Sequence, residues 1–215
     1  MKQDLLTDVV YRRIREMIIV GTLPMGSKIS ESVLATKLSA TKAPIRAALK
    51  KLQSEGLVNI IPKSGTFVFH VTPDEFNELL EFRYVVESEA LSLAFEKNLK
   101  HLVQELSFII DKMEWAITNN SKLEYLQLDN EFHQVIISFC MNRYFKESYD
   151  MICARMATTR NYLGSNEEHM ERSLMQHKEI VNSLTSGDID SSRKLLAEHI
   201  LPQHGAYWKA SNFTS

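Results

Sequence analysis

The chain has 215 residues, of which 44% are hydrophobic and 24% are charged, and its formal net charge is −2. This composition is ordinary for a globular protein, and it excludes a disordered tail, a collagen-like fibre and a disulfide scaffold. With only 7 glycines and 5 prolines, the chain has little turn material, which predicts long helices rather than many short strands.

The charge is unevenly distributed along the chain. Residues 1–72 carry 11 Lys and Arg against 5 Asp and Glu, a net charge of +6, whereas residues 73–215 carry a net charge of −8. A basic first third joined to an acidic remainder indicates a nucleic-acid-binding part attached to a part with another role.

The predicted compartment is the cytoplasm, and no membrane partner is expected. The first residues do not have the pattern of a signal peptide, and no apolar run approaches the roughly 20 residues that span a bilayer. Cys140 and Cys153 lie within apolar helical patterns, so we expect them to be small buried thiols in a reducing environment.

Three helices are predicted in the first third of the chain. The first runs from Thr7 to Val20, the second from Ser30 to Leu38, and the third begins at Thr41. In the third helix, apolar residues recur at helical spacing and predict one buried stripe, made of Ile45, Ala48, Leu49 and Leu52. The opposite face carries small and basic residues, namely Lys42, Ala43, Arg46, Ala47 and Lys50.

After Gly56 the periodicity changes, and residues 57–61 and 66–69 are predicted to form two short strands joined by a hairpin at 62–65. Three helices followed by a basic-tipped hairpin are typical of a winged helix-turn-helix, whose recognition helix enters the major groove of DNA. Alanines on the third helix would let the backbone approach, and Arg46 can reach a guanine edge or a phosphate. The alternative is a solvated face whose charges serve solubility only.

From Thr72 onward the pattern is entirely helical. Thr72 and Glu75 are predicted to form a capping box, as are Ser121 and Glu124, and Pro202 should kink or end the last helix. The six predicted helices lie near residues 73–97, 100–118, 122–140, 144–163, 167–185 and 188–210. The predicted fold is therefore mainly α, with an N-terminal winged helix-turn-helix over 1–72 and a C-terminal six-helix antiparallel bundle over 73–215.

Four polar side chains interrupt the apolar stripes of this bundle, and they are Asp129, His133, His177 and His199. Burying them without partners would cost about 1–3 kcal/mol each. A shared divalent ion would satisfy all four, because imidazole and carboxylate suit Zn, Ni or Mn. For each histidine alone, the alternative is an ordinary hydrogen-bonded core residue. The remaining histidines are predicted to lie at the surface or in linkers, and they are His70, His101, His169 and His204.

An arginine, Arg83, lies in the middle of the apolar stripe of the first bundle helix. A guanidinium that faces a bundle interior needs an anion. This anion is either Asp129 or a neighbouring glutamate, or else the carboxylate of a small ligand held bidentately beside the metal. Arg160 on the fourth bundle helix is a candidate of the same kind.

These motifs resemble the GntR family of bacterial transcription regulators and, within it, the FadR-like subgroup. Residues 38–49 resemble the helix-turn-helix core of the family, residues 52–58 and 65–68 its helix end and wing, and the bundle the ligand-binding FCD domain of the subgroup. The four polar residues of the bundle match the positions where the metal-containing branch places one Asp and three His. The resemblance implies a homodimer on double-stranded operator DNA with inverted half-sites, a bound divalent metal and a small carboxylate effector.

The resemblance also implies roles for individual residues. Lys42 and Arg46 match basic positions that contact DNA, Gly65 matches the wing tip, and Arg83 matches the arginine that faces the ligand cavity. The predicted DNA-binding residues are Ser32, Thr41, Lys42, Ala43, Arg46, Lys50, Lys63 and Gly65. Ser32 replaces a common family arginine, Thr41-Lys42-Ala43 replaces Ser-Arg-Thr, and Ala47 replaces a usual glutamate. These departures predict more reliance on phosphate contacts and hence strong salt dependence.

We therefore predict a transcription regulator and not an enzyme, whose operator affinity is controlled by a small organic acid. The predicted metal ligands are Asp129, His133, His177 and His199, with zinc as the first candidate ion, and the predicted effector-binding residues are Arg83 and Arg160. One alternative is a sensor of the metal itself without an organic effector. Another is a metal-dependent hydrolase with an attached basic domain, since an open metal site can activate water.

Overall fold

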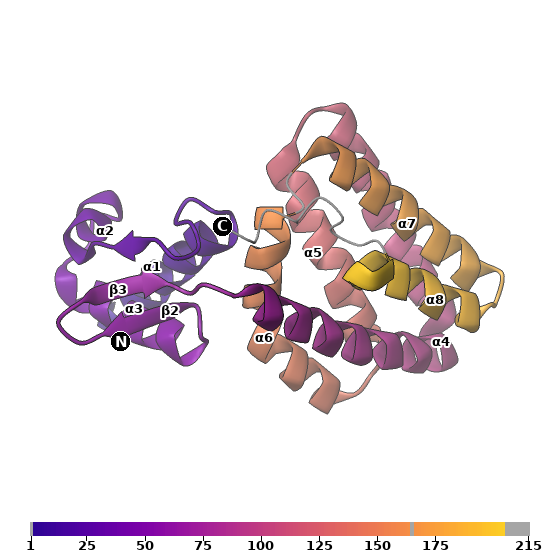
Figure 1. Ribbon diagram of the computed structural model, residues 1–215, viewed down its shortest axis with the longest axis horizontal. Helices are drawn as coiled ribbons and strands as arrows, with labels where there is room; N and C mark the ends of the chain where they lie inside the picture. The colour runs from indigo at the N-terminus through magenta and orange to yellow at the C-terminus, as the bar shows by residue number, and fades with distance from the viewer. Residues whose placement is uncertain (1, 164–165, 205–215) are drawn as a thin grey trace. The chain divides into compact units, whose positions relative to one another are not determined.

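The computed structural model describes residues 2–163 and 166–204, which form mainly α-helices and one small sheet (Figure 1). The chain divides into two compact units. The first comprises Met1–Val71 and Met151–Tyr162, and the second comprises Thr72–Asp150 and Leu163–Ser215. The predicted fold class is confirmed, with a winged helix-turn-helix near the N-terminus and a helical bundle after it.

Three helices form the body of the first unit: α1 (Lys2–Ile19), α2 (Glu31–Lys37) and α3 (Lys42–Ser54). Both α1 and α2 pack against α3, and the predicted stripe of α3 is buried. The side-chain oxygen of Ser30 caps α2 by accepting from the backbone N–H of Val33, as expected. The predicted start of α1 at Thr7 was wrong, because residues 2–6 favour helix and extend it toward the N-terminus.

The sheet consists of β1 (Lys28–Ile29), β2 (Val58–Ile61) and β3 (Gly65–Val68), all antiparallel in the order β1-β3-β2. Sequence patterning did not predict β1, because two residues are too short to show an alternation. Gly65 has a φ of +125°, and a Cβ atom there would lie 2.9 Å from Cε of Lys28. The wing tip therefore favours glycine for its backbone conformation, while the flexible end of the Lys28 side chain could move away from a larger residue.

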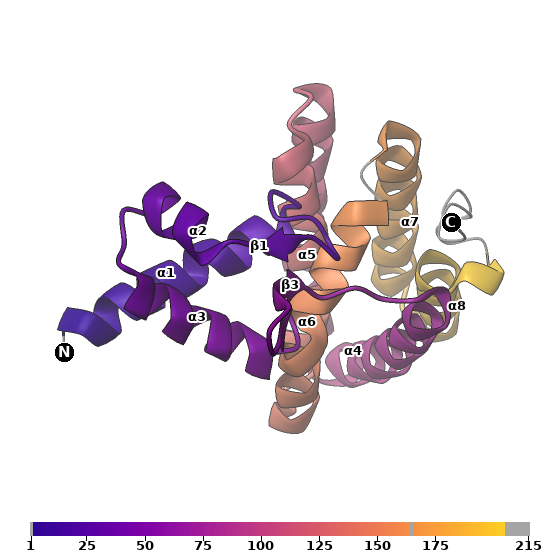
Figure 2. The same cartoon turned by 60° about the vertical axis from the view of Figure 1, so that its left-hand side comes forward.

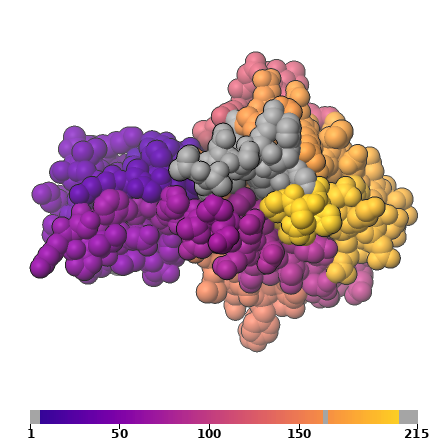
Figure 3. Space-filling model, in the orientation of Figure 1, coloured from indigo at the N-terminus to yellow at the C-terminus, as the bar shows by residue number. Residues whose placement is uncertain are grey.

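The second unit begins with α4 (Pro73–Thr118), which carries the predicted capping box of Thr72 and Glu75. The two helices predicted over 73–118 are joined in α4, and a kink at Asn98, with φ −146° and ψ 28°, separates them. The chain continues through α5 (Lys122–Phe139), α6 (Arg143–Leu163), α7 (Glu167–Thr185) and α8 (Ile189–Ile200). Helix α4 packs against α5, α7 and α8, and Figures 2 and 3 show α4 beside α8.

Two sequence predictions for the second unit were wrong in detail. The last helix was expected to reach residue 210, but α8 ends at Ile200. Pro202 then starts a short 3-10 helix, Pro202–His204, because proline cannot continue an α-helix. Residues 205–210 lie outside the described residues. Ser121 forms no capping box, because its hydroxyl donates to Oε2 of Glu124 (3.1 Å) instead of accepting from the backbone. Asn120, the residue before Ser121, has a φ of +53°. Ser121 itself does not have the extended backbone conformation that is usual for an N-cap residue.

Across the described residues, no helix combines the length and the apolar character that a membrane crossing requires.

Candidate metal centre and DNA interface

The structure brings the four predicted metal ligands together in the interior of the second unit. Asp129 and His133 lie one turn apart on α5, His177 lies on α7 and His199 on α8. One ligand atom from each residue lies within 4.8 Å of all the others, and all four side chains are buried. The i, i+4 spacing on α5 directs two of the donors from one helix face, while the packing of the bundle supplies the other two.

Two of the distances between nitrogen atoms in this cluster are short. Nε2 of His199 lies 3.2 Å from Nε2 of His133 and 3.2 Å from Nε2 of His177. Oδ1 of Asp129 lies 3.8 Å from Nε2 of His177 and accepts a hydrogen bond from the hydroxyl of Ser173 (3.3 Å). In a tetrahedral site with metal–ligand bonds of about 2.1 Å, neighbouring ligand atoms are about 3.4 Å apart, so the His–His separations fit a single ion.

The hydrogen bonds of His199 determine which of its ring nitrogens carries the proton. The side-chain amide of Gln176 donates to the backbone carbonyl of Glu198 (3.4 Å), so its oxygen faces Nδ1 of His199 (3.1 Å). Since an amide oxygen only accepts, Nδ1 of His199 carries the proton and the Nε2 lone pair points into the cluster.

The same argument applies to His133. Nη2 of Arg83 lies 2.6 Å from Nε2 of His133, and a guanidinium nitrogen only donates. Nε2 of His133 is therefore an acceptor, and Nδ1 donates its proton to Oε2 of Glu87 (2.6 Å). Nε2 of both His133 and His199 is thus unprotonated, which is the state that a metal ligand needs, although the lone pair of His133 accepts from Arg83 in this structure.

The electrostatics of the cluster favour a neutral imidazole at His199. Burial, followed by the neighbouring His177, His133 and Arg83, holds the pKa of His199 well below its usual value. The ring is consequently neutral near pH 7, and neutral imidazole is the form that binds a metal. Three neutral imidazoles and one carboxylate are a donor set for a borderline divalent ion such as Zn, Ni or Mn. The residues therefore fit the metal that the sequence predicted.

A ring stack supports His177 from one side. The Phe132 ring lies nearly parallel to the His177 imidazole, with centroids 4.0 Å apart and an interplanar angle of 20°. Phe132 is itself completely buried on α5. Because this ring covers one face of the imidazole, it restricts the plane of the His177 ring, in which Nε2 lies 3.2 Å from Nε2 of His199.

The predicted effector arginine, Arg83, is completely buried on α4 and has an anion from the protein itself. Nε of Arg83 donates to Oε1 of Glu87 (2.8 Å), one turn along the same helix, and the hydroxyl of Tyr149 donates to the same oxygen (2.9 Å). Sequence analysis did not single out Glu87, although its i, i+4 spacing from Arg83 was a usable signal. The other predicted effector residue, Arg160, is buried on α6 but belongs to the other compact unit, so its role stays a prediction.

The remaining predicted surface histidines are exposed, with one exception. His70, His101 and His204 are exposed, as expected, but His169 on α7 is half-buried. Burial lowers the pKa of His169, Asp129 opposes this shift, and Arg172 and Arg83 add to it. His169 is therefore part of the surroundings of the cluster rather than a surface residue. The sequence feature that could have predicted this position is the spacing of eight residues between His169 and His177, which places both on one stripe of α7.

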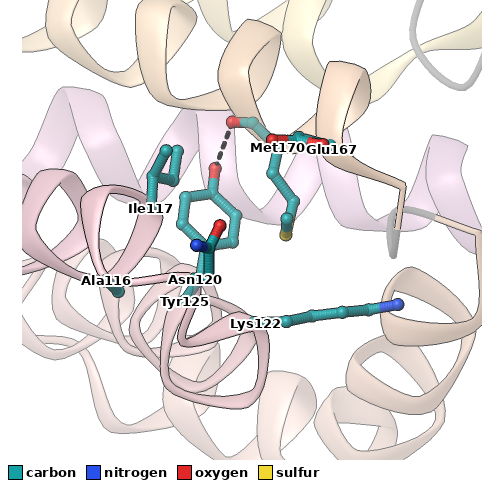
Figure 4. A pocket seen from close by; sticks show the side chains of 7 residues that line it. All are labelled: Ala116, Ile117, Asn120, Lys122, Tyr125, Glu167 and Met170. Carbon is teal, nitrogen blue, oxygen red and sulfur yellow. Dashed lines mark hydrogen bonds between the residues drawn. The ribbon is translucent and has the colours of Figure 1, made fainter.

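A separate hollow of about 190 Å³ lies where α4 ends and α5 begins (Figure 4). Its lining consists of Ala116, Ile117, Asn120, Lys122, Tyr125, Glu167 and Met170, and none of these was predicted as a site residue. The hydroxyl of Tyr125 donates to the backbone carbonyl of Met170 (2.7 Å), as Figure 4 shows. This bond ties α5 to the first part of α7, and these two helices carry three of the four candidate ligands.

In the first unit, α3 presents the face that the sequence predicted. Lys42, Ala43, Arg46 and Lys50 are exposed, and so are Thr41 at the start of the helix and Ser32 on α2. At the wing, Lys63 is exposed and Gly65 is half-buried.

A residue that sequence analysis missed, Glu31 on α2, forms an ion pair with Arg46 through Nε and Oε2 (2.7 Å). The side chain of Arg46 remains 63% exposed. The pair therefore directs the guanidinium without covering it, and the exposed face of α3 that carries Arg46 is basic.

Comparison with known proteins agrees with this architecture. Residues 6–68 match the family described as bacterial regulatory proteins, gntR family, and residues 78–201 match the FCD domain. The chain belongs to the GntR family and carries an FCD domain. The metal-ligand candidates all lie within the stretch that matches the FCD domain, and the predicted DNA-binding residues all lie within the stretch that matches the gntR family.

Relatives of this GntR-family chain match it over most of its length, and solved structures share its fold. The gluconate operon transcriptional repressor of Bacillus licheniformis is 28% identical over 196 residues, which is 86% of this chain and 78% of the relative. Among solved structures, E. coli McbR/YncC has a TM-score of 0.80 at 21% identity and covers 95% of this chain and 98% of its own. A putative transcriptional regulator GntR from Rhodococcus sp. RHA1 has a TM-score of 0.81 at 20% identity, with the same coverage.

Proposed function

We propose that this GntR-family regulator binds operator DNA with an affinity controlled by a small carboxylate, which binds at a divalent metal held by Asp129, His133, His177 and His199. The observation that carries the proposal is the convergence of these four buried donors within 4.8 Å of one another, with Nε2 of His133 and His199 unprotonated. Three imidazoles and a carboxylate packed this closely in a bundle core are a donor set that a divalent cation would satisfy together. The similarity to a gluconate operon repressor supports repression as the direction of control.

The chemistry of the surrounding residues suits a carboxylate. A bound divalent ion would supply a Lewis-acid position for a carboxylate oxygen. Arg83, buried beside His133, would supply a charge-assisted donor for the same group. Arg83 is already paired with Glu87, so the guanidinium is held in place before an acid arrives, which lowers the entropic cost of binding.

For the DNA-binding unit, we propose that α3 lies in the major groove. Arg46 would read a base edge, Lys42 and Lys50 would contact phosphates, and Lys63 at the wing would contact the adjacent backbone. Thr41, Ala43, Ser32 and Gly65 would complete the contact surface. The affinity should fall steeply with salt concentration, because most of these contacts neutralise phosphates.

We further propose that two copies bind inverted half-sites, as expected for a two-fold symmetric helix-turn-helix dimer. The second unit has an apolar surface suited to a second copy, since Phe82 and Val85 on α4 and Tyr144 on α6 are 41%, 59% and 62% exposed. They line one groove of about 280 Å³. Light scattering after gel filtration should give twice the chain mass, and Val85→Asp should reduce it to a monomer.

The effector proposal is tested by fluorescence anisotropy on an operator located by footprinting the DNA upstream of the protein's own coding region. Gluconate, acetate, lactate and citrate are titrated into the operator complex, once with zinc-loaded protein and once after removal of metal by a chelator. The expected result is that an acid changes the operator affinity of the zinc-loaded protein only, and that His177→Ala abolishes the response. If none of these acids changes the affinity more than twofold, effector control is refuted. If affinity follows zinc occupancy and ignores every acid, the protein is a metal sensor instead.

A further inference from the structure

Glu87 occupies an unusual position for a carboxylate, because it is completely buried in the bundle and three donors surround it. Its two oxygens are used differently. Oε1 accepts from Nε of Arg83 and from the hydroxyl of Tyr149, whereas Oε2 accepts from Nδ1 of His133 at 2.6 Å. The bond to His133 is the one that reaches the candidate metal centre.

The bond to His133 determines how that ring can act. An imidazole presents a lone pair on one nitrogen only when its proton is on the other, and a carboxylate that accepts from Nδ1 stabilises that tautomer. Nη2 of Arg83, which faces Nε2 of His133 at 2.6 Å, requires the same tautomer. The Arg83–Glu87 pair therefore holds the ring from both nitrogens, and Nε2 of His133, which accepts from Arg83, lies 3.2 Å from Nε2 of His199.

We propose that Glu87 is the positioning residue of the centre: it holds the proton of His133 on Nδ1 and so keeps Nε2 unprotonated, in the form that binds a metal once the metal displaces the Arg83 donor. This inference rests on the proposed function, because the metal is part of it. It adds a residue outside the four ligands, from a helix that contributes none of them. Arg83 and Tyr149 both donate to Oε1 of Glu87, so they act on His133 by orienting this carboxylate. Arg83 also acts on His133 directly, through Nη2.

The substitution Glu87→Gln separates positioning from simple space filling, because it keeps the shape and replaces one oxygen by an NH2 group. Arg83 and Tyr149 both require an acceptor at the Oε1 position. The amide oxygen should therefore remain there, which places the NH2 group against Nδ1 of His133. That nitrogen would have to become an acceptor, and the ring proton would move to Nε2, where it blocks the metal and forces Nη2 of Arg83 to turn away.

The experiment uses the full-length protein labelled with 15N at histidine, with the His133 signals assigned through His133→Gln. In metal-stripped wild type, Nδ1 of His133 should be protonated and Nε2 should not, and in Glu87→Gln the two nitrogens should exchange these states. Zinc affinity, measured by competition with a chromophoric chelator, should fall 10- to 100-fold in Glu87→Gln, the range seen when a carboxylate behind a metal-bound histidine is lost. The matched control is Glu89→Gln, two residues away and exposed in an ion pair with Arg193 (2.5 Å), which should behave as wild type.

The outcomes separate this inference from the proposed function. If wild type binds zinc and Glu87→Gln binds it equally well, the positioning role is overturned while the metal site stands. If wild type binds no zinc, the proposed function fails, and exchange of the His133 proton in Glu87→Gln would still support the positioning role. A wild type that carries the His133 proton on Nε2 overturns the inference even if the variant fails to fold.

Discussion

Replacing Arg83 by methionine should destabilise the second unit by about 3–5 kcal/mol, because it leaves a buried carboxylate without its cation. Arg83 and Glu87 are both 0% exposed, and Nε and Oε1 lie 2.8 Å apart. Methionine fills a similar volume, so the cost arises from charge rather than from a cavity.

The contacts in the structure lead to the same magnitude. Arg83 donates to Oε1 of Glu87 at 2.8 Å and to Nε2 of His133 at 2.6 Å. A hydrogen bond that involves a charged group contributes about 1.5–3 kcal/mol, so two of them account for about 3–6 kcal/mol. The double variant Arg83→Met/Glu87→Met removes both charges and should recover part of the loss, since an apolar pair of similar volume often replaces a buried ion pair at little cost.

The assay is urea denaturation of metal-stripped protein followed by the fluorescence of Trp115, in a Trp208→Phe background. Trp115 lies on α4, in the same unit as Arg83, so its signal follows the relevant transition. Arg193→Met is the matched control, because Arg193 forms an ion pair with Glu89 at the surface (side chains 38% and 51% exposed) and should cost less than about 1 kcal/mol. An Arg83→Met variant no less stable than this control would refute the reasoning.

Three further predictions concern DNA binding, pH and the start of α4. Arg46→Ala should weaken operator binding by about 1–3 kcal/mol in anisotropy titrations. The control Glu31→Gln should change the operator affinity less. Equal operator affinities of wild type and Arg46→Ala would contradict a base contact by Arg46. Metal-stripped protein should lose stability as pH falls below about 6.5, because the unfolded chain takes up a proton that buried His199 does not, its pKa being lowered. Urea midpoints measured against pH should show this slope, and His199→Asn should reduce it. Thr72→Ala should lower stability by about 1 kcal/mol in thermal unfolding, while Thr72→Ser, which keeps the cap, should not.

Local periodicity was enough to predict the helices and the candidate ligands. Asp129 and His133 share a helix face at i, i+4, and the buried stripe of α3 follows from the same 3.6-residue repeat. Boundaries were less predictable, because they depend on weak local preferences. Thr7 resembled a helix start but lies within α1, and Ser121 resembled a cap but bonds to the carboxylate of Glu124.

Features that require two elements to meet were not visible in the pattern. The strand β1 has two residues and exists only because β3 pairs with it. The ion pair of Glu31 with Arg46 joins α2 to α3, and the half-buried position of His169 depends on how α7 packs. None of these has a periodic signal, since each is determined by a neighbour that is distant along the chain.

The amino-acid sequence by itself determined the fold class, the basic face of α3 and the presence of four polar residues on the apolar stripes of three helices. These follow from helical and strand repeats, which are properties of adjacent residues. Only the tertiary structure decided that the four donors meet within 4.8 Å, that Glu87 contacts His133, and that Nδ1 of His133 and of His199 each faces a side-chain oxygen. Tautomers and ligand distances depend on groups that other helices bring into contact, and the packing of those helices is a property of the whole bundle.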